Sequence, residues 1–252
     1  AAKKASNFAN GMSRGDHRGT MVLASSLCTD NVEEATLVVD YFDDIQAYLS
    51  SIVAPRYPFA IDEALAADGA AIFECSCAGC HGTYADDGAA ETFPNLLIPL
   101  DVIGTDPSFA TLAAAGGYYH QLREWFNGSF YGMFSEVVTD DPTPGYTAPP
   151  LDGVWATAPY FHNGSVPSIA LVLDSTARPG SWRRIDHDST HFDEAALGWP
   201  WEPATAWNDA PASERKYIYD STSFGYGNGG HTFGDHLDEG ERRAVLEYLK
   251  TL

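Results

Sequence analysis

The residues with the clearest chemistry stand in one short segment. Cys77, Cys80 and His81 form a Cys-x-x-Cys-His pattern, which is the attachment pattern of a c-type haem. Two thiols three residues apart can each add to one vinyl group of a haem, and the adjoining imidazole then lies beneath the iron as its proximal ligand. Neutral imidazole nitrogen suits iron. The segment therefore predicts one covalent haem c, attached at Cys77 and Cys80 and bound through His81.

Two other chemistries use similar residues. Cys75, Cys77, Cys80 and His81 could bind zinc, but structural zinc sites usually take two ligand pairs from separate places, and the chain has no second Cys-x-x-Cys. A disulfide oxidoreductase would need its cysteine pair at the start of a helix in an α/β pattern. The long apolar lead-in to Cys77 does not fit that arrangement, so both readings rank below haem.

Cys28 and Cys75 are the two cysteines that the haem would leave over. Attachment of this kind of haem follows export in bacteria, so we expect a periplasmic or extracellular protein. An oxidising compartment permits a Cys28–Cys75 disulfide. Two unrelated buried thiols explain the pair equally well.

The sixth ligand of the iron decides whether a substrate could reach it. His231 is the first choice, because it lies in the loop Gly229–Gly234 just before the last expected helix. Met133 is the alternative, and a His/Met haem would have the higher potential. A methionine among aromatic residues is, however, usually a packing residue. We expect aromatic cover around the haem from Trp125, Phe126, Trp155, Tyr160 and Phe161.

Three helices should position these residues. Hydrophobic spacing and caps place them over about 31–53, ended by Pro55, from Asp62 to the haem segment, and after Asp238 to the C-terminus. Asp30-x-x-Glu33 and Asp238-x-x-Glu241 read as capping boxes. Gly69 would let the last helix approach the second closely. The expected fold is mainly α, a class I cytochrome c core with long loop insertions and an extra N-terminal helix.

Composition limits the possible partners. The chain has 252 residues with 35 acidic and 14 basic side chains, a formal charge of −21. Such a charge argues against binding nucleic acid or anionic membrane surfaces, and no run of 18 apolar residues predicts a membrane span. We expect a redox partner protein with a basic docking surface. The first residues are not a signal peptide, so we read the chain as mature or as part of something longer.

Three segments also resemble a known family. They are Phe73–Gly82, Ala148–Ser168 (containing Ala158-Pro159-Tyr160-Phe161-His162-Asn163-Gly164) and Gly230–Gly234 with the final helix. They resemble the C-terminal haem domain of the dihaem cytochrome c peroxidase superfamily, and in particular the rubber-oxygenase-like dihaem cytochromes. The resemblance implies a bis-histidine haem with its distal ligand near His231, and it makes His162 a residue near the haem rather than a ligand.

The chain departs from that family by having a single Cys-x-x-Cys-His. The family's enzymes use two haems, so the resemblance implies the electron-relaying half without its catalytic partner. We therefore divide the chain into an N-terminal extension at 1–58, resembling the tail of a preceding haem domain, and a cytochrome c domain at 59–252.

These observations lead to one expected function and one alternative. The expectation is a periplasmic or extracellular monohaem c-type cytochrome that transfers electrons through a six-coordinate haem. The alternative is a peroxidase or oxygenase with an open distal site, in which His162 or His120 would move protons. Arg178, Arg183 and Arg184 are candidate donors to haem propionates. A calcium ion at Asp186-His187-Asp188 or Asp140-Asp141 is a lesser expectation, since no spacing resembles an EF-hand.

Overall fold

The computed structural model describes residues 6–7, 9, 14–15, 17–84, 91–114, 118–136, 144–188 and 190–252. The chain forms two compact units. The first takes residues 1–53, 95–100 and 109–149, and the second takes 54–94, 101–108 and 150–252. The first break lies near the expected boundary at 58, but the first unit also draws on later residues. The division into domains at 1–58 and 59–252 stays a prediction.

The first unit holds helices around a small core. Its described elements are β1 (Ser6–Asn7), β2 (Arg14–Gly15), α1 (His17–Ser25), α2 (Val32–Val39), α3 (Phe42–Ser51), β3 (Leu97–Pro99), most of α7 (Ser108–Ala114), α8 (Tyr118–Gly128), η2 (Phe130–Met133) and β4 (Gly145–Thr147). The core consists of Val22, Ala35, Phe42, Phe126 and Tyr131. β3 and β4 pair antiparallel, with Ile98 opposite Tyr146.

The expected single helix at 31–53 is wrong in its boundaries. The structure has two helices there, α2 and α3, separated at Asp40 and Tyr41. The cap also lies one residue later than predicted: the Asn31 side chain accepts from the Glu34 N–H at 2.9 Å, and Glu34 accepts from the Asp30 N–H at 2.9 Å. Because its side chain accepts from the Glu34 N–H, Asn31 rather than Asp30 is the N-cap of α2.

The second unit contains the longest described helix, α4 (Glu63–Ser76). Its elements are α4 (Glu63–Ser76), α5 (Ala78–His81), most of α6 (Leu100–Ile103), η3 (Val154–Ala156), α9 (Ile169–Leu173), η4 (Ser175–Ala177), β5 (Ser181–Arg184), β6 (Trp201–Pro203), η5 (Trp207–Asp209), η6 (Arg215–Tyr217), β7 (Ile218–Asp220) and α10 (Glu239–Leu249). β5 is the central strand of a three-stranded antiparallel sheet, between β6 and β7.

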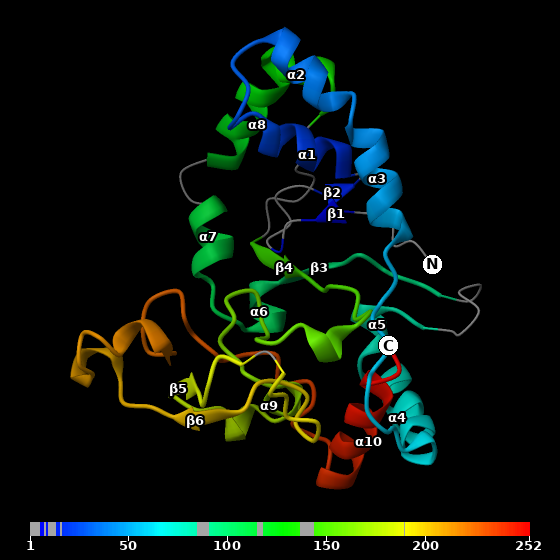
Figure 1. The fold of residues 1–252 in the computed structure, drawn as a ribbon, viewed down its shortest axis with the longest axis vertical. Helices are drawn as coiled ribbons and strands as arrows, with labels where there is room; N and C mark the ends of the chain where they lie inside the picture. The colour runs from blue at the N-terminus through cyan, green and yellow to red at the C-terminus, as the bar shows by residue number, and fades with distance from the viewer. Residues whose placement is uncertain are drawn as a thin grey trace. The chain divides into compact units, whose positions relative to one another are not determined.

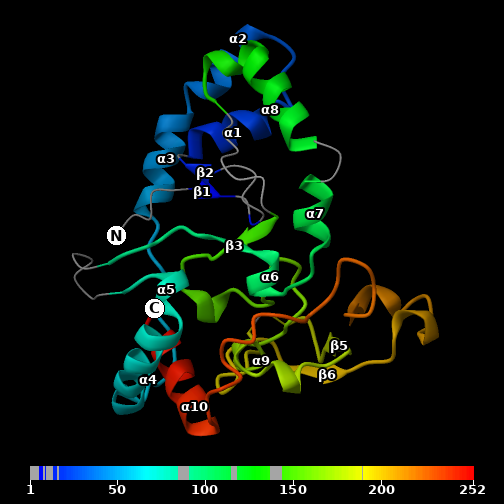
Figure 2. The same cartoon turned by 180° about the vertical axis from the view of Figure 1, so that it is seen from behind.

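Helices α4 and α10 lie side by side, as Figures 1 and 2 both show. Gly69 makes this approach possible, because a Cβ at that position would lie 1.9 Å from the carbonyl oxygen of Ala244 in α10. The Asp62 side chain caps α4 by accepting from Leu65 N–H at 3.1 Å, and Asp238 and Glu241 form the expected capping box of α10. The predicted close crossing and both caps are confirmed.

The prediction of a mainly α fold is wrong. Helices hold only 43% of the residues and strands hold 11%, and the described residues form three small sheets. Each strand is two to four residues long, too short for the alternation of apolar and polar residues that reveals a strand in a sequence. The α4–α10 crossing expected of a cytochrome c core is present within this mixed architecture.

A membrane-crossing helix would need a long and apolar segment. Among the described residues, no helix has both the length and the apolar character to cross a membrane.

Candidate haem site

The Cys-x-x-Cys-His segment continues directly from α4. Cys77 is the C-cap of that helix, with its N–H donating to the carbonyl of Phe73 at 2.8 Å. The N–H groups of Cys80 and His81 then both donate to the carbonyl of Cys77, at 3.1 and 3.0 Å. These bonds close one tight turn, α5, so the helix that packs against α10 also fixes the two thiols and the imidazole.

A glycine ends this turn for a steric reason. Gly82 has a φ of +84°, and a Cβ there would lie 2.0 Å from the carbonyl oxygen of Thr92. Only glycine adopts this conformation and fits this space readily.

All four cysteines are free thiols. Cys28 and Cys75 are exposed and are not bonded to each other, whereas Cys77 and Cys80 are half-buried. Burial, and to a smaller degree the neighbouring Cys80, raises the pKa of Cys77 to about 11, so the folded chain holds a neutral thiol there.

The zinc reading receives no support. Within the described ranges, no three His, Cys, Asp or Glu side chains come together in a group that could hold a metal ion. The cysteines and histidine of the Cys-x-x-Cys-His segment therefore do not converge on one point. Haem attachment needs no such convergence, because the thiols bond to the macrocycle and only the imidazole binds iron.

His81 and His231 are brought together from positions 150 residues apart. Their ring centroids are 6.3 Å apart and the ring planes differ by 55°. A metal-bound imidazole nitrogen lies about 2.0–2.1 Å from the metal, and an imidazole ring with bonds of about 1.33 Å has its corners about 1.1 Å from its centre. Two imidazoles on opposite faces of one iron would therefore have centroids about 6.4 Å apart. Each ring could rotate about the line from its nitrogen to the iron. The 55° angle between the two ring planes is therefore also compatible with this arrangement.

The backbone on either side of His231 is held tightly. The His231 N–H donates to the carbonyl of Ile103, at the end of α6, at 2.7 Å. The preceding Gly230, with a φ of +72°, lies so close to Gly104 that a Cβ would be 2.1 Å from its carbonyl carbon. His231 itself has a φ of +46°. A non-glycine residue in this left-handed region is held there by its surroundings.

Burial keeps the His231 imidazole neutral. It lowers the pKa of His231 to about 4, with smaller contributions from the nearby His81 and Arg178. The neutral ring is the form that binds iron. Within the part of the chain that the structure describes, the His231 Nδ1 is buried without a hydrogen-bond partner. Such a nitrogen is costly to leave unsatisfied, and the chemistry of the pair therefore fits an iron bound between the two rings.

Aromatic rings surround His231. The ring of Phe161 lies 5.8 Å from the imidazole, and that of Phe233 lies 5.2 Å away in a T-shaped contact. Phe161 was expected near the haem. Phe233 was missed, although it stands two residues after His231 in the same loop, and it is 40% exposed.

Trp155 and Tyr160 pack in the core of the second unit. The Trp155 ring makes edge contacts with Tyr57 and Phe192, at centroid distances of 5.2 and 6.2 Å. Tyr160 is buried, and its hydroxyl donates to the carbonyl of Val154 at 3.0 Å. These contacts account for both residues as packing groups, and a role of Trp155 beside the haem stays a prediction.

The alternative sixth ligand and two of the expected aromatic residues lie in the first unit. Met133 is at the end of η2 and its side chain is 73% exposed, whereas His81 belongs to the second unit. Trp125 and Phe126 are on α8, and Phe126 belongs to the core of the first unit. His81, Phe161 and His231 thus belong to the second unit. Met133, Trp125 and Phe126 belong to the first.

Of the three candidate arginines, only Arg178 lies beside His231. Its guanidinium donates to backbone carbonyls, one of which is that of His231, and lies 4.9 Å from the centroid of the Phe161 ring. Arg183 forms ion pairs with Glu202 and Glu214, and Arg184 stacks on Trp199. The binding of haem propionates by any of them stays a prediction.

His162 and Asn163 follow Phe161. Burial lowers the pKa of His162, while the nearby carboxylate of Asp106 opposes this shift. The Asn163 side-chain amide donates to the carbonyls of Gly225 and Gly227, at 3.2 and 2.9 Å. Asn163 thereby ties the segment of Phe161 to the one that leads to His231.

The expected calcium sites gain no support. Asp186 and His191 pair at 2.6 Å, and Asp188 accepts from the Thr190 N–H and hydroxyl. Asp140 and Asp141 lie outside the described residues.

Comparison with known protein families also supports a haem site. Residues 145–183 match a family described as RoxA-like, cytochrome c-like. This segment contains Phe161, His162 and Arg178. The match covers a small part of the chain and supports a cytochrome c-like, haem-binding function.

Two curated relatives come from Sinorhizobium fredii. The uncharacterised protein y4iM is 29% identical over 81% of this chain and 52% of its own length. The uncharacterised protein y4iJ is 28% identical over 79% of this chain and 41% of its own length. The chain thus spans about half the length or less of the curated relatives it matches.

Proposed function

We propose that this chain is a c-type cytochrome, or the cytochrome domain of a longer protein, which carries one covalent haem c and transfers electrons to or from a redox partner. The proposal rests on one observation above all: the imidazoles of His81 and His231 are 6.3 Å apart, the separation expected of two ligands of one iron. The thiols of Cys77 and Cys80 lie in the turn that carries His81.

Each residue of the site has a distinct role in this proposal. Cys77 and Cys80 would anchor the macrocycle, while His81 and His231 would hold its iron. Phe161 and Phe233 pack against His231 and shield it from water. The bound haem supplies one-electron chemistry as its iron changes between the ferric and ferrous states. An iron held by both imidazoles would leave no coordination position for a substrate, which favours electron transfer.

The proposed setting is the periplasm or the cell exterior, where haem of this type is attached in bacteria. The formal charge of −21 favours a partner with a basic docking surface, because complementary charge accelerates encounter.

Absorption and electron paramagnetic resonance spectra test the axial ligands. We would compare the wild type with His231→Ala, and with His236→Ala as a matched control, since His236 is an exposed histidine five residues further on. We expect a low-spin bis-histidine signal in the wild type and in His236→Ala, and a high-spin signal in His231→Ala.

Two other outcomes would change the assignment. A charge-transfer band of His/Met type in the wild type would move the sixth ligand to a methionine, with Met133 the candidate, and would keep electron transfer. A high-spin wild type that His231→Ala leaves unchanged would overturn the bis-histidine site. It would favour the peroxidase or oxygenase alternative, with His162, half-buried near Asp106, as the group that moves protons.

A further inference from the structure

We propose that Arg178 is the positioning residue for His231. Its guanidinium gathers the backbone carbonyls around the distal imidazole and keeps that imidazole on the iron, and its charge sets the reduction potential of the haem. The inference rests on the proposed bis-histidine site and adds to it a residue outside the coordination sphere that controls the site.

All five N–H donors of Arg178 are used, and every acceptor is a backbone carbonyl. Nε donates to Leu171 at 2.7 Å and one Nη2 hydrogen to Val172 at 3.0 Å. The remaining three donate to the loop before α10: Nη1 to Asn228 at 2.8 Å and Gly230 at 2.6 Å, and Nη2 to His231 at 3.2 Å. Arg178 therefore links the end of α9 to the loop that carries His231.

This loop needs such support because of its backbone conformation. Gly230 and His231 both have positive φ values, +72° and +46°, and a non-glycine residue in this region costs on the order of 1–3 kcal/mol unless its surroundings hold it. Charge-assisted hydrogen bonds are the stronger kind, and the fork of the guanidinium reaches several carbonyls at once, which a single ammonium cannot do.

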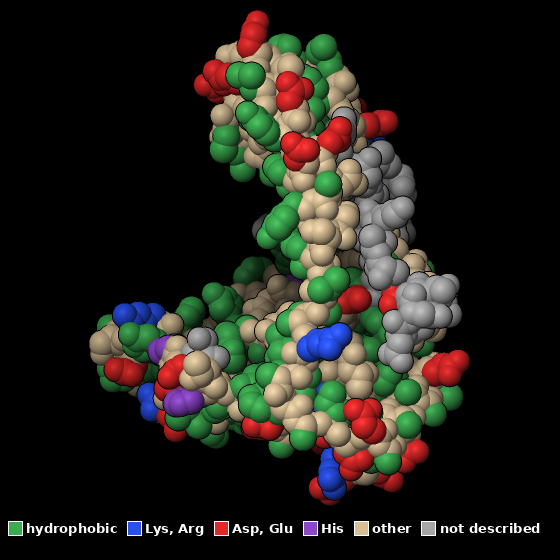
Figure 3. All heavy atoms as spheres, turned by 45° about the vertical axis from the view of Figure 1, so that its right-hand side comes forward, with side chains coloured by type: hydrophobic (Ala, Val, Ile, Leu, Met, Phe, Trp, Pro, Cys, Tyr) green, Lys and Arg blue, Asp and Glu red, His purple; other side chains and the backbone are tan. Residues whose placement is uncertain are grey.

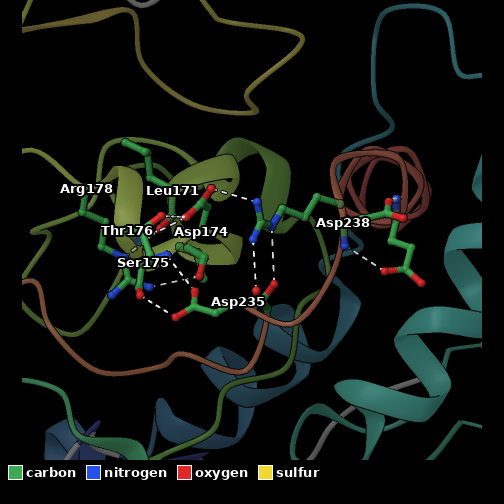
Figure 4. A network of polar contacts seen from close by, with 11 residues as sticks. Leu171, Asp174, Ser175, Thr176, Arg178, Asp235 and Asp238 are labelled. Carbon is green, nitrogen blue, oxygen red and sulfur yellow. Dashed lines mark hydrogen bonds and ion pairs between the residues drawn. The ribbon is translucent and has the colours of Figure 1, made fainter.

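Arg178 is itself fixed at a well-connected corner. It follows η4, where Ser175 donates to Asp235 through both its N–H, at 2.8 Å, and its hydroxyl, at 2.5 Å. Arg242 of α10 donates to Asp174 at 2.8 Å. Figure 4 shows these groups facing one another between η4, the loop around Asp235 and the start of α10. The loop of His231 is thus held to the η4 corner on both sides of His231.

The charge of Arg178 reaches the His231 imidazole, although the nearby carboxylates of Asp235 and Asp174 partly offset it. Its five hydrogen-bond partners are uncharged carbonyl oxygens, and its guanidinium lies 4.9 Å from the centroid of Phe161, whose ring is 5.8 Å from that of His231. A half-buried cation at this place favours the state of the iron with the lower positive charge. Arg178 should therefore raise the reduction potential of the haem as well as hold its ligand.

Two substitutions separate these effects. Arg178→Lys keeps the charge and loses the fork, whereas Arg178→Met loses both. Arg183→Lys and Arg183→Met are matched controls, because Arg183 uses its guanidinium on the half-exposed carboxylates of Glu202 and Glu214. The holoproteins would be compared by low-temperature paramagnetic resonance, by redox titration, by the rate of carbon monoxide binding to the reduced form, and by thermal unfolding.

We expect carbon monoxide to bind faster in both Arg178 variants, by roughly tenfold or more, the factor expected when a charge-assisted hydrogen bond is lost. Carbon monoxide must displace His231, so this readout follows ligand retention rather than general stability. The potential should fall in Arg178→Met and stay close to the wild type in Arg178→Lys. The Arg183 variants should match the wild type in both readouts.

The outcomes distinguish this inference from the proposed function. A low-spin wild type, with carbon monoxide binding and potential unchanged in Arg178→Lys and Arg178→Met, would overturn the positioning role and leave the bis-histidine site intact. A high-spin wild type would overturn both, since His231 would then not be a ligand to position. If Arg178→Met does not fold, the rate of carbon monoxide binding to Arg178→Lys still tests the positioning role. A rate in Arg178→Lys equal to that of the wild type would overturn the inference.

Discussion

At the scale of single residues, the side chains of the candidate site differ in the chemistry for which they are suited. The imidazoles of His81 and His231 are the groups suited to bind iron, while the thiols of Cys77 and Cys80 are suited to bond with the macrocycle. Cys28 and Cys75, by contrast, are exposed free thiols outside the turn. The four cysteines are therefore not equivalent.

This difference predicts how cysteine variants retain haem. In Cys77→Ala/Cys80→Ala, haem should be lost or become fully extractable into acidified organic solvent, because no thioether remains. In Cys28→Ala/Cys75→Ala, the matched control, the haem should stay covalently attached, as pyridine haemochrome spectra of the denatured protein would show. Loss of covalent haem from the control pair instead would contradict the assignment of the attachment residues.

The ion pair of Asp174 and Arg242 predicts a dependence of stability on pH. Hydrogen bonds from Thr176 and the charge of Arg242 lower the pKa of Asp174 below its usual value of 3.8, so the unfolded chain takes up the proton first as the pH falls. The stabilisation is therefore complete well above pH 3.8 and is lost as the pH falls through the folded-state pKa. The two side chains are 23% and 24% exposed, which suggests a contribution of about 1 kcal/mol.

We expect Asp174→Asn to lower the melting temperature at pH 7, and we expect this deficit to shrink as the pH falls below 3.8 through the lowered folded-state pKa of Asp174. Asp101→Asn, at an exposed carboxylate on α6, is the control for the change in net charge. Thermal unfolding of the holoproteins at several pH values would measure the difference, and a deficit that persists undiminished at the lowest pH would refute the ion-pair explanation.

At the scale of elements, the site depends on the crossing of α4 and α10. Helix α4 leads directly into the Cys-x-x-Cys-His turn, α5, and α10 follows the loop of His231. Their core residues Phe73, Val245 and Leu249 are almost fully buried. The two helices therefore fix α5, the turn that carries His81, against the core of the second unit.

Gly69 is the point at which this crossing can be tested. A methyl group there would lie 1.9 Å from the Ala244 oxygen, whereas one at Gly180 would meet nothing within 4 Å. We expect Gly69→Ala to lower the free energy of unfolding by about 1–3 kcal/mol, the usual cost of overpacking, and Gly180→Ala to change it by less than about 0.5 kcal/mol. Denaturant unfolding would measure both, and equal stabilities of the two variants would exclude close helix contact at Gly69.

At the scale of the whole molecule, charge is the dominant property. Carboxylates are spread over the face shown in Figure 3, and basic side chains there are few. This agrees with the 35 acidic and 14 basic residues of the sequence. A surface of this kind repels anionic partners and attracts cationic ones over a distance that salt controls.

The rate of electron transfer to a lysine-rich small cytochrome c should therefore fall as salt rises. We expect a decrease of about tenfold or more between roughly 0.01 and 0.5 M salt. The same partner with its lysines succinylated is the matched control, and its rate should be slow at low salt and rise on screening. Stopped-flow absorption would follow both reactions. A rate that is independent of salt with the native partner would argue against docking through charge.

The sequence by itself determined the features that depend on neighbouring residues. Short stretches of sequence predict the Cys-x-x-Cys-His turn, the Asp62 and Asp238 caps and the small residue at Gly69. A cap or such a turn involves side chains only a few positions apart. It also placed His231 before the last helix. The boundary near Asn31 was misjudged by one residue because two overlapping capping patterns compete there.

Only the tertiary structure decided what depends on residues far apart in the chain. The short strands of the second unit leave no periodic signal, since their stability comes from pairing with distant segments, and the mainly α prediction failed for that reason. The 6.3 Å separation of His81 and His231 joins two segments far apart in the chain, and the packing of Gly230 against Gly104 helps to place the loop of His231. Composition could mark Arg178 as one of several scarce cations. Its five carbonyl partners come from two segments, 171–172 and 228–231, that are far apart in the sequence. The folding of these segments against each other gives Arg178 its place beside His231.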